Sequence, residues 1–261
     1  MKVVATIYTD FSEKFGIPRQ GALAHESEGI IVFEPEYRME EALRGIEKYS
    51  HLWLLWQFSE NVSKKWSPTV RPPRLGGNKR VGVFATRSPF RPNPIGLTAV
   101  RLIGVEQTKN KGAVLRVAGV DLMNGTPIYD IKPYLPYADS IPEASLGFAG
   151  EHLMDVLEVV CSDELWGKIP EDKRGALEEV LSQDPRPAYH EDETRKYGME
   201  FSGFDIIFHV AKKKGLDSLL DMPGFGTLGL DQLKFQLEKH KILNKAGQSE
   251  LYQYIINDPD Y

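Results

Sequence analysis

Residues 79–101, KRVGVFATRSPFRPNPIGLTAVR, place a proline-rich connection between two short apolar runs. The runs at 81–85 and 95–102 each have the length and composition of a β-strand. The prolines of the connection fix φ and remove backbone donors, so this loop is predicted to be stiff. Strands joined by such turns favour a β-rich fold.

The same connection holds two arginines, Arg87 and Arg91. A stiff loop restricts the positions of their guanidinium groups, whose planar fork binds carboxylate and phosphate groups bidentately. These residues therefore indicate a site for an anionic group. An ordinary proline-rich turn with solvated arginines is the alternative interpretation.

Residues 61–105 contain no Asp or Glu, although the whole chain has a net charge of −5. The basic side chains of this stretch are Lys64, Lys65, Arg71, Arg74, Lys79, Arg80, Arg87, Arg91 and Arg101. Acidic residues thus lie elsewhere while basic ones gather here, which is the charge distribution of a nucleic-acid-binding face. A merely solvated basic surface is the alternative.

Further strands are predicted at 2–8, 29–33, 51–58, 113–120 and 128–131, with a short helix at 39–48. The strand at 51–58, HLWLLWQF, lacks polar alternation, which indicates burial on both faces, within a barrel or under a partner subunit. Short strands with Gly/Pro turns favour a closed or nearly closed β-barrel over residues 1–140.

The remainder of the chain has a different character. A linker is expected at 140–150, followed by a smaller α+β domain at 151–261 with a helix at 173–181, a strand at 204–212 and a helical tail. The segment 151–160 fits either a strand or a helix. Residues 224–229, GFGTLG, match the G-x-G-x-x-G pattern, but no strand precedes them, so a Rossmann unit is not predicted.

Several function classes are disfavoured by composition and motifs. Cys161 is the single cysteine, which excludes a disulfide framework and a multi-cysteine metal site, and its apolar neighbours indicate a buried thiol. No apolar run approaches the roughly 20 residues of a membrane helix, and the N-terminus lacks a signal peptide. We expect a cytoplasmic protein without a metal, and a reaction that depends mainly on positioning.

Five sequence blocks together resemble the TrmO-like tRNA methyltransferases. These blocks are FGIPRQ (15–20), SHLWLLWQF (50–58), the stretch 71–97, DLMNGTPIYDIKPYLPY (121–137) and QDPRPAY (183–189). The resemblance implies an antiparallel β-barrel methyltransferase, unlike the Rossmann and knotted classes, that acts as a homodimer with its cofactor near the subunit interface. It further implies S-adenosylmethionine-dependent methylation of N6 of N6-threonylcarbamoyladenosine at position 37 of threonine tRNA.

The resemblance also implies particular contacts with the cofactor. They are expected from Gln20, Gly21, Ala22, Phe58, Ser59, Arg87, Leu97, Asp121 and Leu122. Arg87 would face the carboxylate of S-adenosylmethionine. Many relatives carry a histidine at the position of Ser59, so this side chain departs from the family pattern.

Further hypotheses concern catalysis, from the chemistry of the implied reaction, and tRNA binding, mainly from the basic stretch. Asp130, or alternatively Asp121, would take the N6 proton, and the capping of a turn is the alternative role of each carboxylate. Lys132 or an arginine of the basic stretch would pair with the threonyl carboxylate. The anticodon stem-loop would contact Arg71, Arg74, Lys79, Arg80, Arg91 and Tyr134. A non-catalytic RNA-binding barrel, or a methyltransferase of this fold with another acceptor, remains the alternative.

Overall fold

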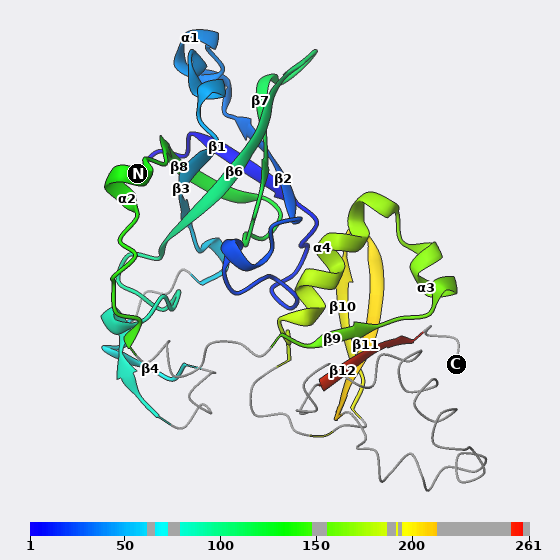
Figure 1. Ribbon diagram of the computed structural model, residues 1–261. Helices are drawn as coiled ribbons and strands as arrows, with labels where there is room; N and C mark the ends of the chain where they lie inside the picture. Colours follow the sequence, from blue (N-terminus) through cyan, green and yellow to red (C-terminus); the bar gives the residue numbers. More distant parts are fainter. Residues whose placement is uncertain are drawn as a thin grey trace, which may run out of the picture.

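The computed structural model describes residues 1–61, 66–72, 79–147, 156–186, 192, 195–212 and 252–257 of the chain. Figure 1 shows a barrel formed by the N-terminal half and, beside it, a second sheet accompanied by helices. Lys64, Lys65 and Arg74 of the predicted basic face lie outside the described residues, as does the glycine-rich sequence at 224–229.

Six strands form a closed barrel in the order β1-β2-β7-β6-β3-β8. They are β1 (Ala5–Thr9), β2 (Glu28–Phe33), β3 (His51–Gln57), β6 (Ile95–Thr108), β7 (Gly112–Ala118) and β8 (Thr126–Pro133). Every pair is antiparallel, and pairing of β8 with β1 closes the barrel. Closure leaves no exposed sheet edge, and it confirms the predicted antiparallel β-barrel.

Strand β3 shows how the sequence fills this barrel. Leu52, Leu54 and Trp56 point into the core and are buried, whereas Trp53 and Leu55 alternate with them and are half-buried. The prediction of burial on both faces is therefore wrong within this chain. A barrel wall has one face toward its core and one toward the outside, and large apolar residues occupy both in β3.

Two predicted elements are interrupted. The helix predicted at 39–48 ends early, because Gly45 adopts φ 91° and separates α1 (Glu40–Leu43) from a 3₁₀ turn at Ile46–Lys48. The strand predicted at 81–85 contains only β5 (Val81–Gly82), which pairs with β4 (Thr69–Val70), and the chain then turns through a 3₁₀ helix at Val83–Ala85.

Short elements complete the described part of the first 147 residues. They are 3₁₀ turns at Gly21–Leu23, Pro35–Tyr37 and Ser59–Asn61, and the four-residue helix α2 (Pro136–Asp139). The longest strand, β6, continues to Thr108, six residues beyond the predicted end at 102. Its register shifts between Leu102 and Gly104, so an irregularity lets the strand bend and pair further with β7.

The second unit contains a four-stranded sheet in the order β10-β11-β12-β9. Its elements are β9 (Glu158–Val160), α3 (Asp163–Lys168), α4 (Glu171–Ser182), β10 (Tyr197–Phe201), β11 (Phe204–Lys212) and β12 (Tyr252–Asn257). The predicted helix at 173–181 and strand at 204–212 are confirmed. The prediction of a helical tail is wrong at 252–257, where β12 pairs with β11 and, in parallel, with β9.

One hydrophobic cluster runs through both units. It includes Ile7, Leu54 and Leu115 of the barrel and Leu177 and Phe208 of the second unit, all fully buried. Cys161 packs half-buried against this cluster, and burial raises the pKa of its thiol. Among the described helices, none is long and apolar enough to cross a membrane.

Candidate cofactor-binding site

A cavity of about 490 Å³ opens at one end of the barrel. Its lining comes from the end of β3 at 56–60, the start of β6 at 95–98, the proline-rich connection, and Asp121 before β8. The remaining wall is the first loop, the segment 10–27 between β1 and β2. We refer to it as the barrel-end cavity; ligand pockets commonly occupy about 300–1,000 Å³ at such barrel mouths.

A chain of hydrogen bonds crosses the floor of the barrel-end cavity. The Trp56 indole Nε1–H donates to Thr98 Oγ1 (3.1 Å), and the Thr98 hydroxyl donates to Asp121 Oδ1 (2.7 Å). The backbone N–H of Gly21 donates to Asp121 Oδ2 (3.0 Å). Because both carboxylate oxygens are held, the position of Asp121 is fixed by β6 and by the first loop.

The Asp121 carboxylate is electrostatically costly in this position. Burial raises the pKa of the Asp121 carboxyl above its usual value, while the bonds from Thr98 and Gly21 and the charge of Arg87 oppose the rise. A half-buried carboxylate, destabilised by burial and only partly stabilised by hydrogen bonds, favours a cationic group or hydroxyl donors as its neighbour. It is the strongest candidate for direct contact with a charged ligand in the barrel-end cavity.

Arg87 and Gln20 meet across the mouth of the barrel-end cavity. Arg87 Nη1 donates to Gln20 Oε1 (2.5 Å), and Gln20 Nε2 donates to the Arg19 carbonyl oxygen (2.7 Å). The proline-rich connection is thereby joined to the first loop. The Arg87 side chain remains exposed and therefore accessible to an anionic group.

Aromatic rings form the apolar side of the barrel-end cavity. The rings of Trp56 and Phe58 pack edge to face with centroids 4.3 Å apart. Trp56 pairs in register with Gly96, where an added Cβ would lie 2.2 Å from the indole Cε2. The absence of a side chain at residue 96 thus lets the indole lie flat against β6 and reach Thr98.

The barrel-end cavity brings together six of the residues predicted to bind the cofactor. They are Gln20, Phe58, Ser59, Arg87, Leu97 and Asp121. The three others do not line it: Ala22 is exposed, Leu122 lies in the core, and Gly21 contributes its backbone N–H to Asp121. Gly21 lies so close to the chain that an added Cβ would be 2.2 Å from the Gly119 carbonyl oxygen.

Asp130 and Lys132 form an ion pair, in which Lys132 Nζ lies 2.8 Å from Asp130 Oδ2. The two side chains therefore lie on the same side of β8, as predicted. Neither lines the barrel-end cavity, but each pairs in register with β3, Asp130 with Leu55 and Lys132 with Trp53. Trp53 does line the cavity. The pair therefore lies one strand from its wall, on the outer face of the barrel.

The predicted tRNA-binding residues that the structure describes differ in their surroundings. Arg71, Lys79 and Arg80 are exposed beside β4 and β5, with Arg80 donating to Thr69 Oγ1. Arg91 instead donates to backbone carbonyl oxygens of its own loop, including that of Thr86 at 2.7 Å, and so stabilises the proline-rich connection. Tyr134 is half-buried against Trp53, with ring centroids 5.4 Å apart.

Sequence reasoning missed Trp56 and Thr98 as site residues. These two residues are recognisable only from the pairing of β3 with β6, in which Trp56 lies opposite Gly96 and Thr98 follows two residues later on the same side of β6. It also missed a set of exposed aromatic rings near the basic residues, Trp66, Phe84 and Phe90. Trp66 and Phe84 lie with centroids 6.3 Å apart.

Comparisons with known proteins agree with this architecture. Residues 6–140 match the tRNA-methyltransferase O N-terminal domain, and residues 158–216 match the TrmO C-terminal domain. A tRNA (adenine(37)-N6)-methyltransferase of Escherichia coli is 42% identical over 79% of this chain and 91% of its own length. A putative S-adenosylmethionine-dependent methyltransferase of Pseudomonas aeruginosa is 40% identical over 85% of this chain and 96% of its own.

Solved structures give the same result. A crystal structure of TrmO covers 99% of both chains with a TM-score of 0.65 and 29% sequence identity. A TrmO structure from Pseudomonas aeruginosa covers 98% of this chain and 97% of its own, with a TM-score of 0.66 and 28% identity. The matched domains span most of the chain, the blocks that resembled the family lie in them, and the chain therefore belongs to the tRNA-methyltransferase O family.

Proposed function

We propose that this protein transfers a methyl group from S-adenosylmethionine to N6 of N6-threonylcarbamoyladenosine at position 37 of threonine tRNA. The observation that carries the proposal is the barrel-end cavity, in which Asp121, Arg87 and Gln20 converge beside the rings of Trp56 and Phe58. Family membership, and relatives named as tRNA (adenine(37)-N6)-methyltransferases, support the same reaction.

The residues of the barrel-end cavity fit S-adenosylmethionine. Arg87 is exposed at its mouth and suits the methionine carboxylate, while Phe58 and Leu97 offer apolar surface for the adenine. The held carboxylate of Asp121 suits a cationic or hydroxyl-bearing part of the molecule. When bound, this cofactor supplies an electrophilic methyl group on a sulfonium centre. The protein must therefore position the acceptor and accept at most one proton.

Asp130 and Lys132 are the residues we assign to the modified base. The N6–H of N6-threonylcarbamoyladenosine belongs to a ureido group and is more acidic than that of adenosine, so a carboxylate such as Asp130 can take its proton. Lys132 would pair with the threonyl carboxylate. Plain adenosine lacks this carboxylate and would not form the ion pair with Lys132, which gives a physical reason for preferring the modified base.

We assign different roles to the two parts of the chain. Residues 1–140 hold the cofactor and the reacting base, and residues 151–261 support tRNA binding or subunit contact in a cytoplasmic homodimer. Leu97, Leu55 and Asp130 are in-register neighbours on three adjacent strands, so Asp130 lies two interstrand spacings, about 10 Å, from Leu97 in the lining of the barrel-end cavity. A partner subunit covering this outer face would enclose both in one site.

Methyl transfer from labelled S-adenosylmethionine to two tRNA pools tests the proposal. One pool carries threonylcarbamoyladenosine at position 37, and the other lacks the threonylcarbamoyl group. We expect label only in the modified pool, and a loss of rate of about 10²-fold for Asp130→Asn. Asp139→Asn, an exposed carboxylate on α2, is the matched control. Label in neither pool, with folded protein, would point to a binding protein or another acceptor.

Binding of tRNA is tested separately by its salt dependence. If exposed cations beside β5 contact phosphates, affinity should fall steeply with salt, and Lys79→Ala should reduce the slope of log affinity against log salt by about one. Lys109, exposed in the turn between β6 and β7, gives the control Lys109→Ala. A flat salt dependence would remove the phosphate contacts from the proposal.

A further inference from the structure

The first loop is attached to the second unit of the structure. It carries Gln20 into the barrel-end cavity and Gly21 to the Asp121 carboxylate, yet it belongs to no long helix or strand. A segment of this kind has large conformational entropy, of order 1–2 kcal/mol per residue. Contacts with the barrel and with the second unit offset this cost.

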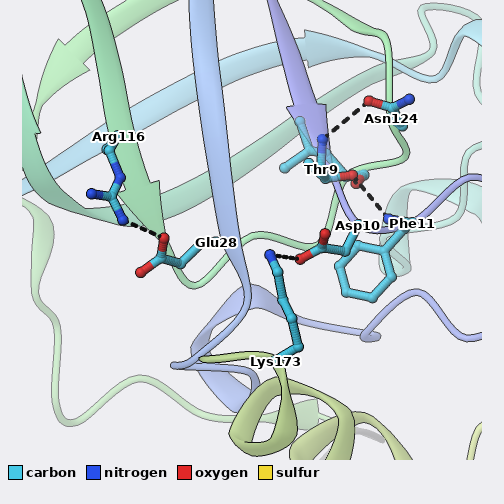
Figure 2. A network of polar contacts seen from close by, with 8 residues as sticks. Thr9, Asp10, Phe11, Glu28, Arg116, Asn124 and Lys173 are labelled. Atoms are coloured by element: carbon cyan, nitrogen blue, oxygen red, sulfur yellow. Dashed lines mark hydrogen bonds and ion pairs between the residues drawn. The ribbon is translucent and has the colours of Figure 1, made fainter. Parts of the chain in front are cut away.

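An ion pair fixes the beginning of the first loop. Lys173 of α4 places its Nζ 2.7 Å from Asp10 Oδ2, and these side chains are only 26% and 18% exposed. Figure 2 shows Lys173 reaching up from the helix to Asp10, which directly follows the end of β1. The backbone N–H of Ser202 also donates to the Asp10 carbonyl oxygen (3.0 Å). Asp10 is thus held from α4 and from the turn between β10 and β11.

Further contacts with the second unit follow along the first loop. Arg19 Nη2 donates to the Asp184 carbonyl oxygen (3.0 Å), and Gln183 Nε2 donates to the Leu23 carbonyl oxygen (2.6 Å). Close to its end, the N–H of Glu26 donates to Glu179 Oε2 (2.8 Å). These contacts bracket Gln20 and Gly21 on both sides, at residues 10 and 19 before them and at 23 and 26 after them.

We propose that Lys173 is a positioning residue of the barrel-end cavity: through Asp10 it holds the first loop in the conformation that presents Gln20 and the Gly21 N–H to the bound molecule. Neither Lys173 nor Asp10 lines the cavity. The inference rests on the proposed function only in taking that molecule to be S-adenosylmethionine. It gives the second unit a role in cofactor binding, distinct from contact with tRNA.

The test compares two ion pairs, both drawn in Figure 2. Lys173→Ala removes the pair between α4 and the first loop. Arg116→Ala removes the pairs that this residue of β7 forms with Glu28 of β2 (2.8 Å) and with Glu106 of β6 (3.2 Å). Two readouts are used in the full-length protein: the Kd for S-adenosylmethionine, and hydrogen exchange at the Gly21 amide, with the Leu54 amide in β3 as internal reference.

We expect Lys173→Ala to raise the Kd about tenfold, because affinity falls in proportion to the population of the competent loop conformation. The Gly21 amide should exchange faster while the Leu54 amide does not. Asp10→Asn should reproduce both effects, Lys173→Arg should restore both, and Arg116→Ala should change neither.

Other outcomes separate the possible failures. An unchanged Kd and unchanged Gly21 exchange in Lys173→Ala would overturn the inference, as would equal acceleration at Gly21 and Leu54, which marks general destabilisation. A Lys173→Arg protein that behaves like Lys173→Ala would also refute the role of the ion pair. If the wild-type protein does not bind S-adenosylmethionine, the proposed function fails, and the exchange data alone decide whether Lys173 positions the loop.

Discussion

Replacing Thr98 with valine removes one hydroxyl from the floor of the barrel-end cavity while keeping the shape and the β-branching of the side chain. Thr98 is 5% exposed, and its hydroxyl serves two partners. It accepts from the Trp56 indole N–H and donates to Asp121 Oδ1. The substitution therefore leaves a buried donor without an acceptor and a carboxylate oxygen without its donor.

The expected loss of stability follows from these bonds. A hydrogen bond to a charged group contributes about 1.5–3 kcal/mol, and an unsatisfied buried donor costs about 1–3 kcal/mol. The losses share one hydroxyl and are not independent, so we expect the free energy of unfolding to fall by about 3 kcal/mol near neutral pH.

The loss should also depend on pH, because burial raises the pKa of Asp121 and the Thr98 bond opposes that rise. Without the hydroxyl the pKa in the folded protein rises further, while the unfolded value is unchanged. At a pH between the unfolded and the folded pKa of Asp121, the folded state holds a proton that the unfolded state has lost, so the free energy of unfolding falls as pH rises. The defect of Thr98→Val is thus smallest below the unfolded pKa of Asp121 and grows as pH rises through the folded one.

Urea unfolding without ligand, at several pH values between about 4 and about 8, measures this directly. Thr98→Ser keeps the hydroxyl and is the control: it should lose stability through its missing methyl group without the added pH dependence. A Thr98→Val defect below about 1 kcal/mol, or one that is constant across the pH range, would refute the hydrogen-bonded floor.

Three further predictions concern the same cavity. Gly96→Ala puts a Cβ 2.2 Å from the Trp56 ring and should cost about 1–3 kcal/mol of stability in urea unfolding, whereas Gly104→Ala on the same strand meets no atom within 4 Å and should cost far less. Arg87→Ala should raise the Kd for S-adenosylmethionine about tenfold in calorimetry and change the Kd for tRNA less; equal losses would argue against its placement at the cofactor carboxylate. A cationic ligand favours the ionised form of Asp121, so cofactor affinity should rise with pH through the raised pKa of this group. Asp121→Asn should abolish that rise, and an identical pH profile in both proteins would exclude direct contact.

Local signals in the sequence were sufficient for the strands of the barrel but not for their irregularities. The apolar runs at 29–33 and 51–58 correspond closely to β2 and β3, since a barrel strand needs a continuous inward row of apolar residues. The extension of β6 to Thr108 was missed because its last part is polar and contains Gly104, where the register shifts. Such a shift depends on the partner strand and leaves no local pattern.

The candidate site likewise contains residues with a local sequence signal and residues without one. Arg87 was predicted from the proline-rich connection and Gln20 from the family resemblance, whereas the floor of the barrel-end cavity joins residues distant in sequence. Asp121 bonds the N–H of a residue 100 positions earlier, and Lys173 bonds a residue 163 positions earlier. No spacing rule connects such residues. Only the closure of β8 onto β1 and the packing of α4 on the first loop bring them together.

The proposed function places a nucleoside cofactor in the barrel-end cavity without a glycine-rich phosphate loop. Dinucleotide sites place backbone N–H groups of a helix N-terminus against a pyrophosphate. S-adenosylmethionine has no phosphate; its charges are one carboxylate, one ammonium and one sulfonium. An exposed guanidinium such as Arg87 and a desolvated carboxylate such as Asp121 complement that set of charges directly. Here the glycine residues have a different use. Gly21 allows close approach to Gly119 and donates its N–H to Asp121, and Gly96 allows the Trp56 ring to reach Thr98.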